Sequence, residues 1–136
     1  MAKKQIATFL GPQLSISYMG GNTWGGWSGL LKPINGTDVV AFNFGSPNKA
    51  LIAEMGWFVN FDGISGGKFL QFTVSLNGTT VIDQKGEMVG TADWPGTFPF
   101  VVPSLIIPPK SKVIVTVATD EAVTVNQYVT FVGKEI

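Results

Sequence analysis

Carboxylates are the first side chains to consider for chemistry in this sequence. The 136 residues contain no histidine and no cysteine. Ser-His-Asp and Cys-His catalysis are therefore excluded, and zinc loses its usual ligands. Glycoside hydrolysis remains possible, because it needs only two carboxyl groups placed across a sugar. The candidates for such a pair are Glu54, Asp62, Asp83, Glu87, Asp93, Asp120 and Glu121.

The positions of these carboxylates favour structural roles. Asp62, Asp93 and Asp120 stand near glycine, proline or other turn formers, where aspartate commonly serves the turn. Glu54 lies within an apolar stretch, on a mixed face where a solvated glutamate is ordinary. A calcium site built from loop aspartates stays open as an alternative, although no loop has the alternating acidic spacing of such a site. We expect a protein that is not an enzyme and holds no cofactor or metal.

Apolar side chains repeat with a period of two, which predicts strands along most of the chain. Segment 50–61 is the clearest, with one face continuously apolar and the other mixed. The pair Asn77-Gly78 is a strong two-residue hairpin signal. It predicts a hairpin between 68–76 and 79–84, with Val74 opposite Val81.

The C-terminal part predicts a second ribbon over 113–131, which turns at Asp120-Glu121. Segment 97–107 is apolar but contains Pro99 and Pro103, and proline cannot donate to a ladder, so we expect an edge or kinked strand there. Segment 108–111 (PPKS) predicts a sharp corner. Shorter strands are expected at 6–10, 14–18 and 39–44, and a glycine-rich loop at 20–29.

The strand pattern indicates the fold class. No stretch shows a helical period, and turn residues separate eight or nine strand-length segments. The pattern is typical of an all-β protein, a single jelly-roll-like antiparallel β-sandwich of about eight strands. We expect one domain that spans residues 1–136.

The charge balance narrows the range of partners. Nine lysines and nine acidic residues give a net charge of +0, and there is no arginine. Nucleic-acid binding depends on attraction to phosphates, so we expect no nucleic-acid partner. No apolar stretch approaches the roughly 20 residues of a membrane helix, and the run after Lys3 and Lys4 is too short and polar for a signal peptide. We expect no membrane partner and synthesis in the cytoplasm.

The composition also predicts that the surface is covered by protein. Charged residues form 13% of the chain, about half the usual share, while hydrophobic residues form 45%. A domain of this size cannot bury all of that apolar surface by itself. With zero net charge, self-repulsion gives little protection against association. We therefore expect a homo-oligomer or a multi-copy component of an assembly.

Three tryptophans and the N-terminal arm are the candidate contact residues. Trp24 and Trp27 could cap the core, contact a protein or stack on a sugar, since exposed aromatic rings suit both kinds of partner. Trp94 is open to the same alternatives. The predicted partner interface consists of Lys4, Ile6, Phe9, Trp24, Trp27 and Trp94.

One run in the C-terminal half resembles a known family. In residues 98–117 an apolar strand meets a Pro-Pro corner and then a β-branched strand (FPFVVPSLIIPPKSKVIVTV). This run is similar to the late strands of small jelly-roll capsid decoration (cement) proteins of tailed bacteriophages. Segments 129–134 and 59–78 fit the same pattern. The resemblance implies a structural virion protein that binds and bridges major capsid protein subunits, with no catalytic motif to carry over.

Two other functions remain as alternatives. The first is a carbohydrate- or receptor-binding jelly-roll module of the tail-tip or adhesin type, in which Trp24 and Trp27 would form a sugar cleft. The second is a carboxylate hydrolase that uses Glu54.

Overall fold

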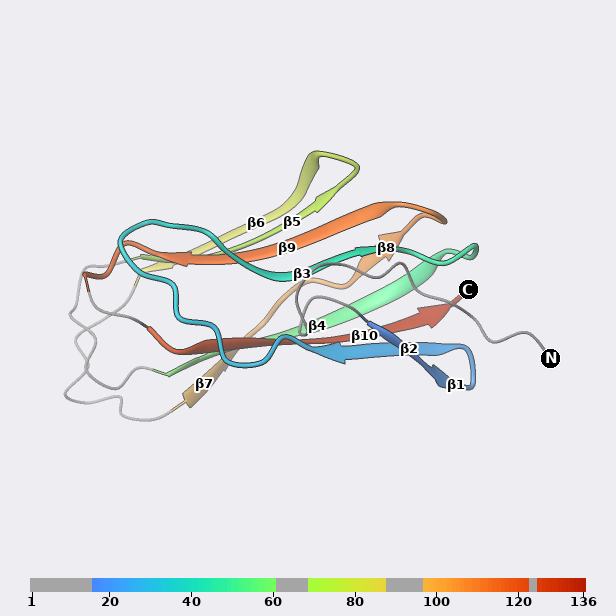
Figure 1. The fold of residues 1–136 in the computed structure, drawn as a ribbon, viewed down its shortest axis with the longest axis horizontal. Helices are drawn as coiled ribbons and strands as arrows, with labels where there is room; N and C mark the ends of the chain where they lie inside the picture. The colour runs from blue at the N-terminus through green and yellow to red at the C-terminus, as the bar shows by residue number, and fades with distance from the viewer. Residues whose placement is uncertain (1–15, 61–68, 88–96, 123–124) are drawn as a thin grey trace.

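The computed structural model describes residues 16–60, 69–87, 97–122 and 125–136, and these residues build two antiparallel β-sheets that pack face to face (Figure 1). No helix in these ranges is long and apolar enough to cross a membrane. The ten strands are β1 (Ser17–Gly20), β2 (Thr23–Trp27), β3 (Val39–Gly45), β4 (Leu51–Asn60), β5 (Phe69–Leu76), β6 (Thr79–Glu87), β7 (Thr97–Phe100), β8 (Leu105–Ile107), β9 (Lys112–Thr119) and β10 (Gln127–Glu135).

Two sheets of unequal size form the sandwich. The six-stranded sheet has the order β1-β2-β10-β4-β7, and β8 also pairs with β4. The four-stranded sheet has the order β3-β9-β5-β6. The arrangement confirms the expected jelly-roll-like β-sandwich, with ten strands rather than eight or nine.

The proline-interrupted segment 97–107 forms the edge that was expected. β7 pairs with residues 57–60 of β4, and β8 pairs with residues 51–53 of the same strand. Pro103 lies in the connection between β7 and β8, where the chain leaves the ladder. One predicted edge strand is thus two short strands along the same side of β4.

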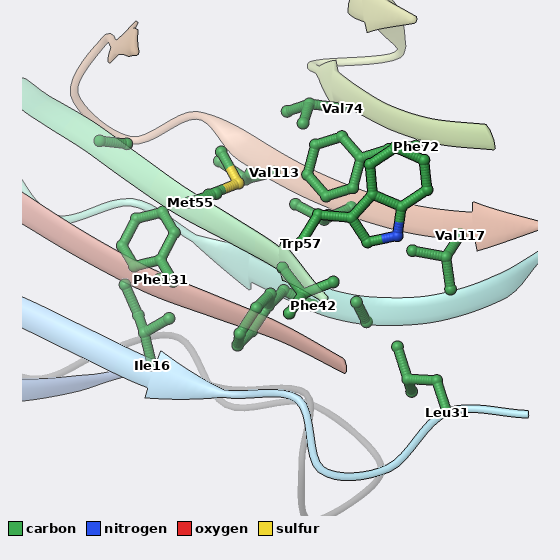
Figure 2. Close-up of a cluster of buried hydrophobic side chains, with 14 of the residues drawn as sticks. Ile16, Leu31, Phe42, Met55, Trp57, Phe72, Val74, Val113, Val117 and Phe131 are labelled. Carbon is green, nitrogen blue, oxygen red and sulfur yellow. The ribbon is translucent and has the colours of Figure 1, made fainter. Parts of the chain in front are cut away.

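The core lies between the sheets and follows the strand period. In β4 the residues 51, 53, 55, 57 and 59 are buried, while Ile52 and Glu54 are exposed. Trp57 and Phe72 come from opposite sheets, and their ring centroids are 5.4 Å apart (Figure 2). Phe131 meets Phe44 in the same way, at 5.2 Å. Aromatic pairs of this kind fix the two layers against each other.

Two details of strand pairing correct the sequence predictions. Val74 lies opposite Ile82 rather than Val81, because a bulge interrupts the β5–β6 register there. β9 and β10 do not form a ribbon. They belong to different sheets, because the connection after Thr119 carries the chain across the sandwich, so that Val117 and Val129 are both buried between the layers.

The glycine-rich stretch 20–29 is a strand hairpin and not a loop. β1 and β2 pair antiparallel, and β2 also pairs with β10, so β2 lies inside the sheet. Gly20, Gly21 and Asn22 at the turn have φ values of 88°, 58° and 61°, a region that glycine and asparagine tolerate. β1 begins at Ser17, within the strand expected at 14–18, and the strand expected at 6–10 lies outside the described residues.

Candidate interaction surface

Three aromatic side chains line up across neighbouring strands on the outer face of the six-stranded sheet. Trp27 comes from β2, Tyr128 from β10 and Phe58 from β4, and Tyr128 lies directly opposite Phe58. The rings of Phe58 and Tyr128 stack nearly parallel, 4.6 Å apart at 11°. Trp27 meets Tyr128 edge to face at 6.3 Å and 77°. We call these three residues the aromatic row.

A glycine makes room for the aromatic row. Gly56 lies two residues before Phe58 on the same face, opposite Thr130. A Cβ at position 56 would lie 2.6 Å from Thr130 Oγ1 and 2.7 Å from Phe58 Cε1. Real side chains do not tolerate such contacts, so the Phe58 ring can lie back along β4 only because residue 56 is glycine.

The apolar surface continues along the sheet beyond the aromatic row. Val132 is opposite Glu54, and Ile52 is opposite Ile106. These side chains are exposed, as is Met19, which lies against Gly25 on the same face. The exposed fraction is 61% for Trp27 and 62% for Ile106, both large for apolar side chains. We call the aromatic row together with Met19, Ile52, Ile106 and Val132 the apolar face.

The outer face of the four-stranded sheet has a different character. Its cross-strand neighbours are polar: Gln71 Nε2 donates to Asp83 Oδ1 over 2.8 Å, and the hydroxyls of Thr73 and Thr116 contact each other. Phe69 is exposed on this side, with Lys85 Nζ 5.4 Å from its ring centroid. Among the described strands, most exposed large apolar side chains therefore belong to the six-stranded sheet, whereas the four-stranded sheet exposes Phe69 and Val81.

The candidate carboxylates that the structure describes are divided between the two sheets. Glu54 is exposed on the apolar face, whereas Asp83 lies in β6 of the opposite sheet and Asp120 directly follows β9 of that sheet. Asp120 Oδ1 accepts a hydrogen bond from the Phe69 backbone N–H at 2.7 Å, the turn-stabilising role expected from its sequence position. No group of three acidic side chains in the described ranges could hold a metal ion. Asp62 and Asp93 lie outside the described residues.

The interface prediction for Trp24 is wrong. Trp24 is fully buried, its Nε1 donates to Glu135 Oε2 at 2.9 Å, and its ring lies 5.2 Å from that of Tyr18. β2 is a regular strand, so residues 24 and 27 point to opposite sides of the sheet. Trp24 faces the core for that reason, and Trp27 faces outward.

The other predicted contact residues divide into two groups. Trp27 is placed on the apolar face, as part of the aromatic row. Lys4, Ile6, Phe9 and Trp94 lie outside the described residues, so their predicted contacts stay predictions.

Sequence reasoning missed Phe58, Tyr128 and Val132 as surface residues. A signal was present for Phe58, since it falls on the mixed face of the strand at 50–61. Nothing local in the sequence indicates that Tyr128 lies beside Phe58, because β4 and β10 are far apart in the sequence and become neighbours only in the folded sheet.

Comparison with known proteins gives a likeness of fold only. No protein-family model and no curated protein matches this chain. Solved structures do match. One is of infectious bursal disease virus, Gx strain, at 16% identity and TM-score 0.53, covering 83% of this chain and 32% of that chain. Another is the VP2 subviral particle of the same virus, at 18% identity and TM-score 0.50, covering 95% of this chain and 37% of that chain.

A third match is a viral particle of the same virus, at 16% identity and TM-score 0.51. It covers 95% of this chain and 35% of that chain, so this sequence spans about a third of the chains it resembles. The likeness shows that the β-sandwich described here also occurs in chains of a virus particle.

Proposed function

We propose that this chain is a structural protein of a virion that binds neighbouring protein subunits through the apolar face. The observation that carries the proposal is the one-sided exposure of Trp27, Ile106 and Val132 on a sheet whose other side is core. Large apolar side chains exposed together on one sheet face, here with Glu54 and Lys134 among them, mark sites where proteins associate. The likeness of fold to chains of a virus particle supports a virion as the assembly to which this chain belongs.

The finer proposal is a capsid decoration or cement protein of a tailed bacteriophage. The partner would be the major capsid protein, and the chain would be made in the host cytoplasm and act in the virion. The resemblance of residues 98–117 to late strands of such proteins supports this choice. Many copies of the chain bound over a symmetric shell would also suit a single docking face of modest area. Simultaneous contacts to neighbouring subunits raise the effective affinity of each copy.

The aromatic row suits rigid docking. Phe58 and Tyr128 are already stacked on each other and Trp27 is braced on Tyr128, so little side-chain freedom is left to lose on binding. Tryptophan and tyrosine are typical interface anchors. Burial of a standard interface, roughly 1,600 Å² in total, can then give tight binding.

Rebinding to particles tests the proposal. Particles of the virus that encodes this chain are depleted of it, incubated with purified chain and sedimented, and the bound chain is quantified. We expect saturable binding that Trp27→Ala and Val132→Lys each weaken at least about tenfold. Lys112→Ala, on the opposite sheet, should bind like the wild type. Particles that contain none of this chain, or equal binding by all variants, would contradict the proposal.

A sugar-binding module is the second candidate, and the exposed ring of Trp27 favours it. Within the aromatic row, Phe58 and Tyr128 stack on each other and are half-buried, whereas the Trp27 ring is exposed and could stack on a sugar. A glycan array distinguishes the two candidates: reproducible glycan binding that Trp27→Ala abolishes would support this one.

The proposal includes no catalytic activity. Its support is the separation of Glu54 from the carboxylates of the opposite sheet. Polysaccharide turnover that Glu54→Gln abolishes would contradict this part of the proposal.

A further inference from the structure

β6 forms one edge of the four-stranded sheet, and within the described residues its far side is open. It pairs with β5 from Glu87 back to Thr79 and with no other described strand. At nine residues it is long for an edge strand. Alternate N–H and C=O groups of an edge strand point away from the sheet and can pair with a further strand.

Two opposite charges project from the outer face of this edge. Asp83 lies opposite Thr73, and Lys85 lies opposite Gln71. Both side chains are held in place by β5: Asp83 Oδ1 accepts from Gln71 Nε2, and Lys85 Nζ lies over the Phe69 ring. The edge therefore presents an ordered negative charge and an ordered positive charge two residues apart.

Among the registers whose axis lies at residues 82 to 85, one fits the pattern of Asp83 and Lys85. When two identical edges pair antiparallel, the two-fold axis is perpendicular to the sheet and one residue faces its own copy. An axis at Asp83 would place two carboxylates opposite each other, and an axis at Lys85 would place two ammonium groups together. An axis at Ile82 would leave both charges opposite neutral residues. An axis at Gln84 places each charge opposite its counterpart.

The position on that axis is itself suitable. Gln84 is uncharged, and its side chain is turned from the outer face, since Nε2 donates to the carbonyl oxygen of Val101 at 2.7 Å. On the inner side, Ile82 would face the partner's Gly86, a large apolar side chain against the smallest residue. The bulge at Val81 lies outside this central stretch.

We propose that two copies of this chain associate through β6, antiparallel, with Gln84 on the two-fold axis. Asp83 of each copy then pairs with the partner's Lys85, and the two four-stranded sheets become one continuous sheet. Main-chain hydrogen bonds supply affinity, and the two charge pairs select the register. This association does not depend on the proposed function. An axis perpendicular to the sheet leaves both apolar faces on the same side of the dimer.

Charge swaps at the edge test the dimer. Sedimentation velocity compares wild type, Asp83→Lys, Lys85→Asp and the double variant, each checked for folding by circular dichroism. We expect the wild type to dimerise within a concentration series that reaches about 300 µM. The dissociation constant of each single variant should be at least about tenfold higher, because like charges then face each other across the contact. The double variant exchanges the two signs and should recover wild-type affinity.

Lys112→Asp serves as the control, because it reverses an exposed charge on β9 and away from this edge. It should dimerise like the wild type. A monomeric wild type, single variants that dimerise normally, or a double variant that stays monomeric would each overturn the proposal. The particle-binding experiment tests Trp27 and Val132, which lie on the other sheet, so the two proposals fail separately.

Discussion

At the scale of single residues, a buried hydrogen bond between two distant strands sets a measurable constraint. Trp57 Nε1 donates to Gln127 Oε1 over 2.7 Å, and both side chains are fully buried. Trp57→Phe leaves the Gln127 oxygen unpaired, and Gln127→Leu leaves the indole N–H unpaired. We expect Trp57→Phe to lower the free energy of unfolding by about 2–3 kcal/mol. Gln127→Leu should cost less, about 1–2 kcal/mol, because it also removes the buried Gln127 Nε2, which has no hydrogen-bond partner.

The double variant Trp57→Phe/Gln127→Leu removes both polar partners together. Its loss should fall short of the sum of the single losses by about 1–2 kcal/mol, because no buried donor or acceptor of the pair is then left unpaired. Urea unfolding of the four proteins gives the coupling. Additive losses would mean that the hydrogen bond is not the source of the destabilisation.

Trp24 and Trp27 should respond oppositely to substitution. Trp24→Phe removes buried ring atoms and leaves Glu135 without the indole donor, so we expect a loss of about 2–3 kcal/mol in the free energy of unfolding. Trp27→Ala exposes little new surface in the isolated chain and should cost under about 1 kcal/mol. Urea midpoints measure both, and equal losses would show that Trp27 also belongs to the core.

The sequence contained the information needed to separate these two tryptophans. An odd spacing of three places them on opposite faces of any strand. Five glycines between residues 20 and 29 made a loop the natural interpretation. The structure gives particular reasons for three of these glycines. Gly20 and Gly21 have positive φ at the end of β1 and in the hairpin turn, and Gly25 lies under the Met19 side chain.

At the scale of elements, the β5–β6 hairpin was predictable because its signal is local. Asn77 and Gly78 have φ values of 51° and 86°, as the two-residue turn requires. Gly78→Ala forces a side chain into the left-handed region and should cost about 1 kcal/mol in the free energy of unfolding.

Gly86→Ala is the matched control in the same strand. Its Cβ would meet Phe100 Cε1 at an ordinary 3.9 Å and needs no positive φ. Thermal unfolding should place this variant close to the wild type. Equal destabilisation by both alanines would show that turn geometry is not the cause.

Other elements were beyond local reasoning. The turn fixes the register only near itself, and the bulge at Val81 then shifts every later pair by one residue. The assignment of β9 and β10 to one ribbon failed because a strand period does not say which sheet a strand joins. Val113 and Val129 face the core whether β9 and β10 pair with each other, as predicted, or lie in different sheets, as observed. The inward-facing pattern therefore does not distinguish the two arrangements.

At the scale of the whole molecule, composition predicted a surplus of apolar surface without placing it. Its placement depends on β10 lying between β2 and β4, a non-local pairing that brings Trp27, Tyr128 and Phe58 together. The polar character of the four-stranded sheet's outer face likewise follows only once the strand order of that sheet is known. A surface made by strands from three parts of the chain leaves no local motif.

The two proposed contacts of the molecule should respond differently to salt. The β6 edge contact depends on two exposed charge pairs, which contribute roughly 0.2–1 kcal/mol each. Raising NaCl from 0.1 M to 1 M shortens the screening length from about 10 Å to about 3 Å. We expect the dimer to weaken about fivefold in sedimentation velocity, while particle binding by the apolar face holds or strengthens, because apolar burial does not depend on screened charge. Loss of particle binding with rising salt would assign that contact to charge and away from Trp27, Ile106 and Val132.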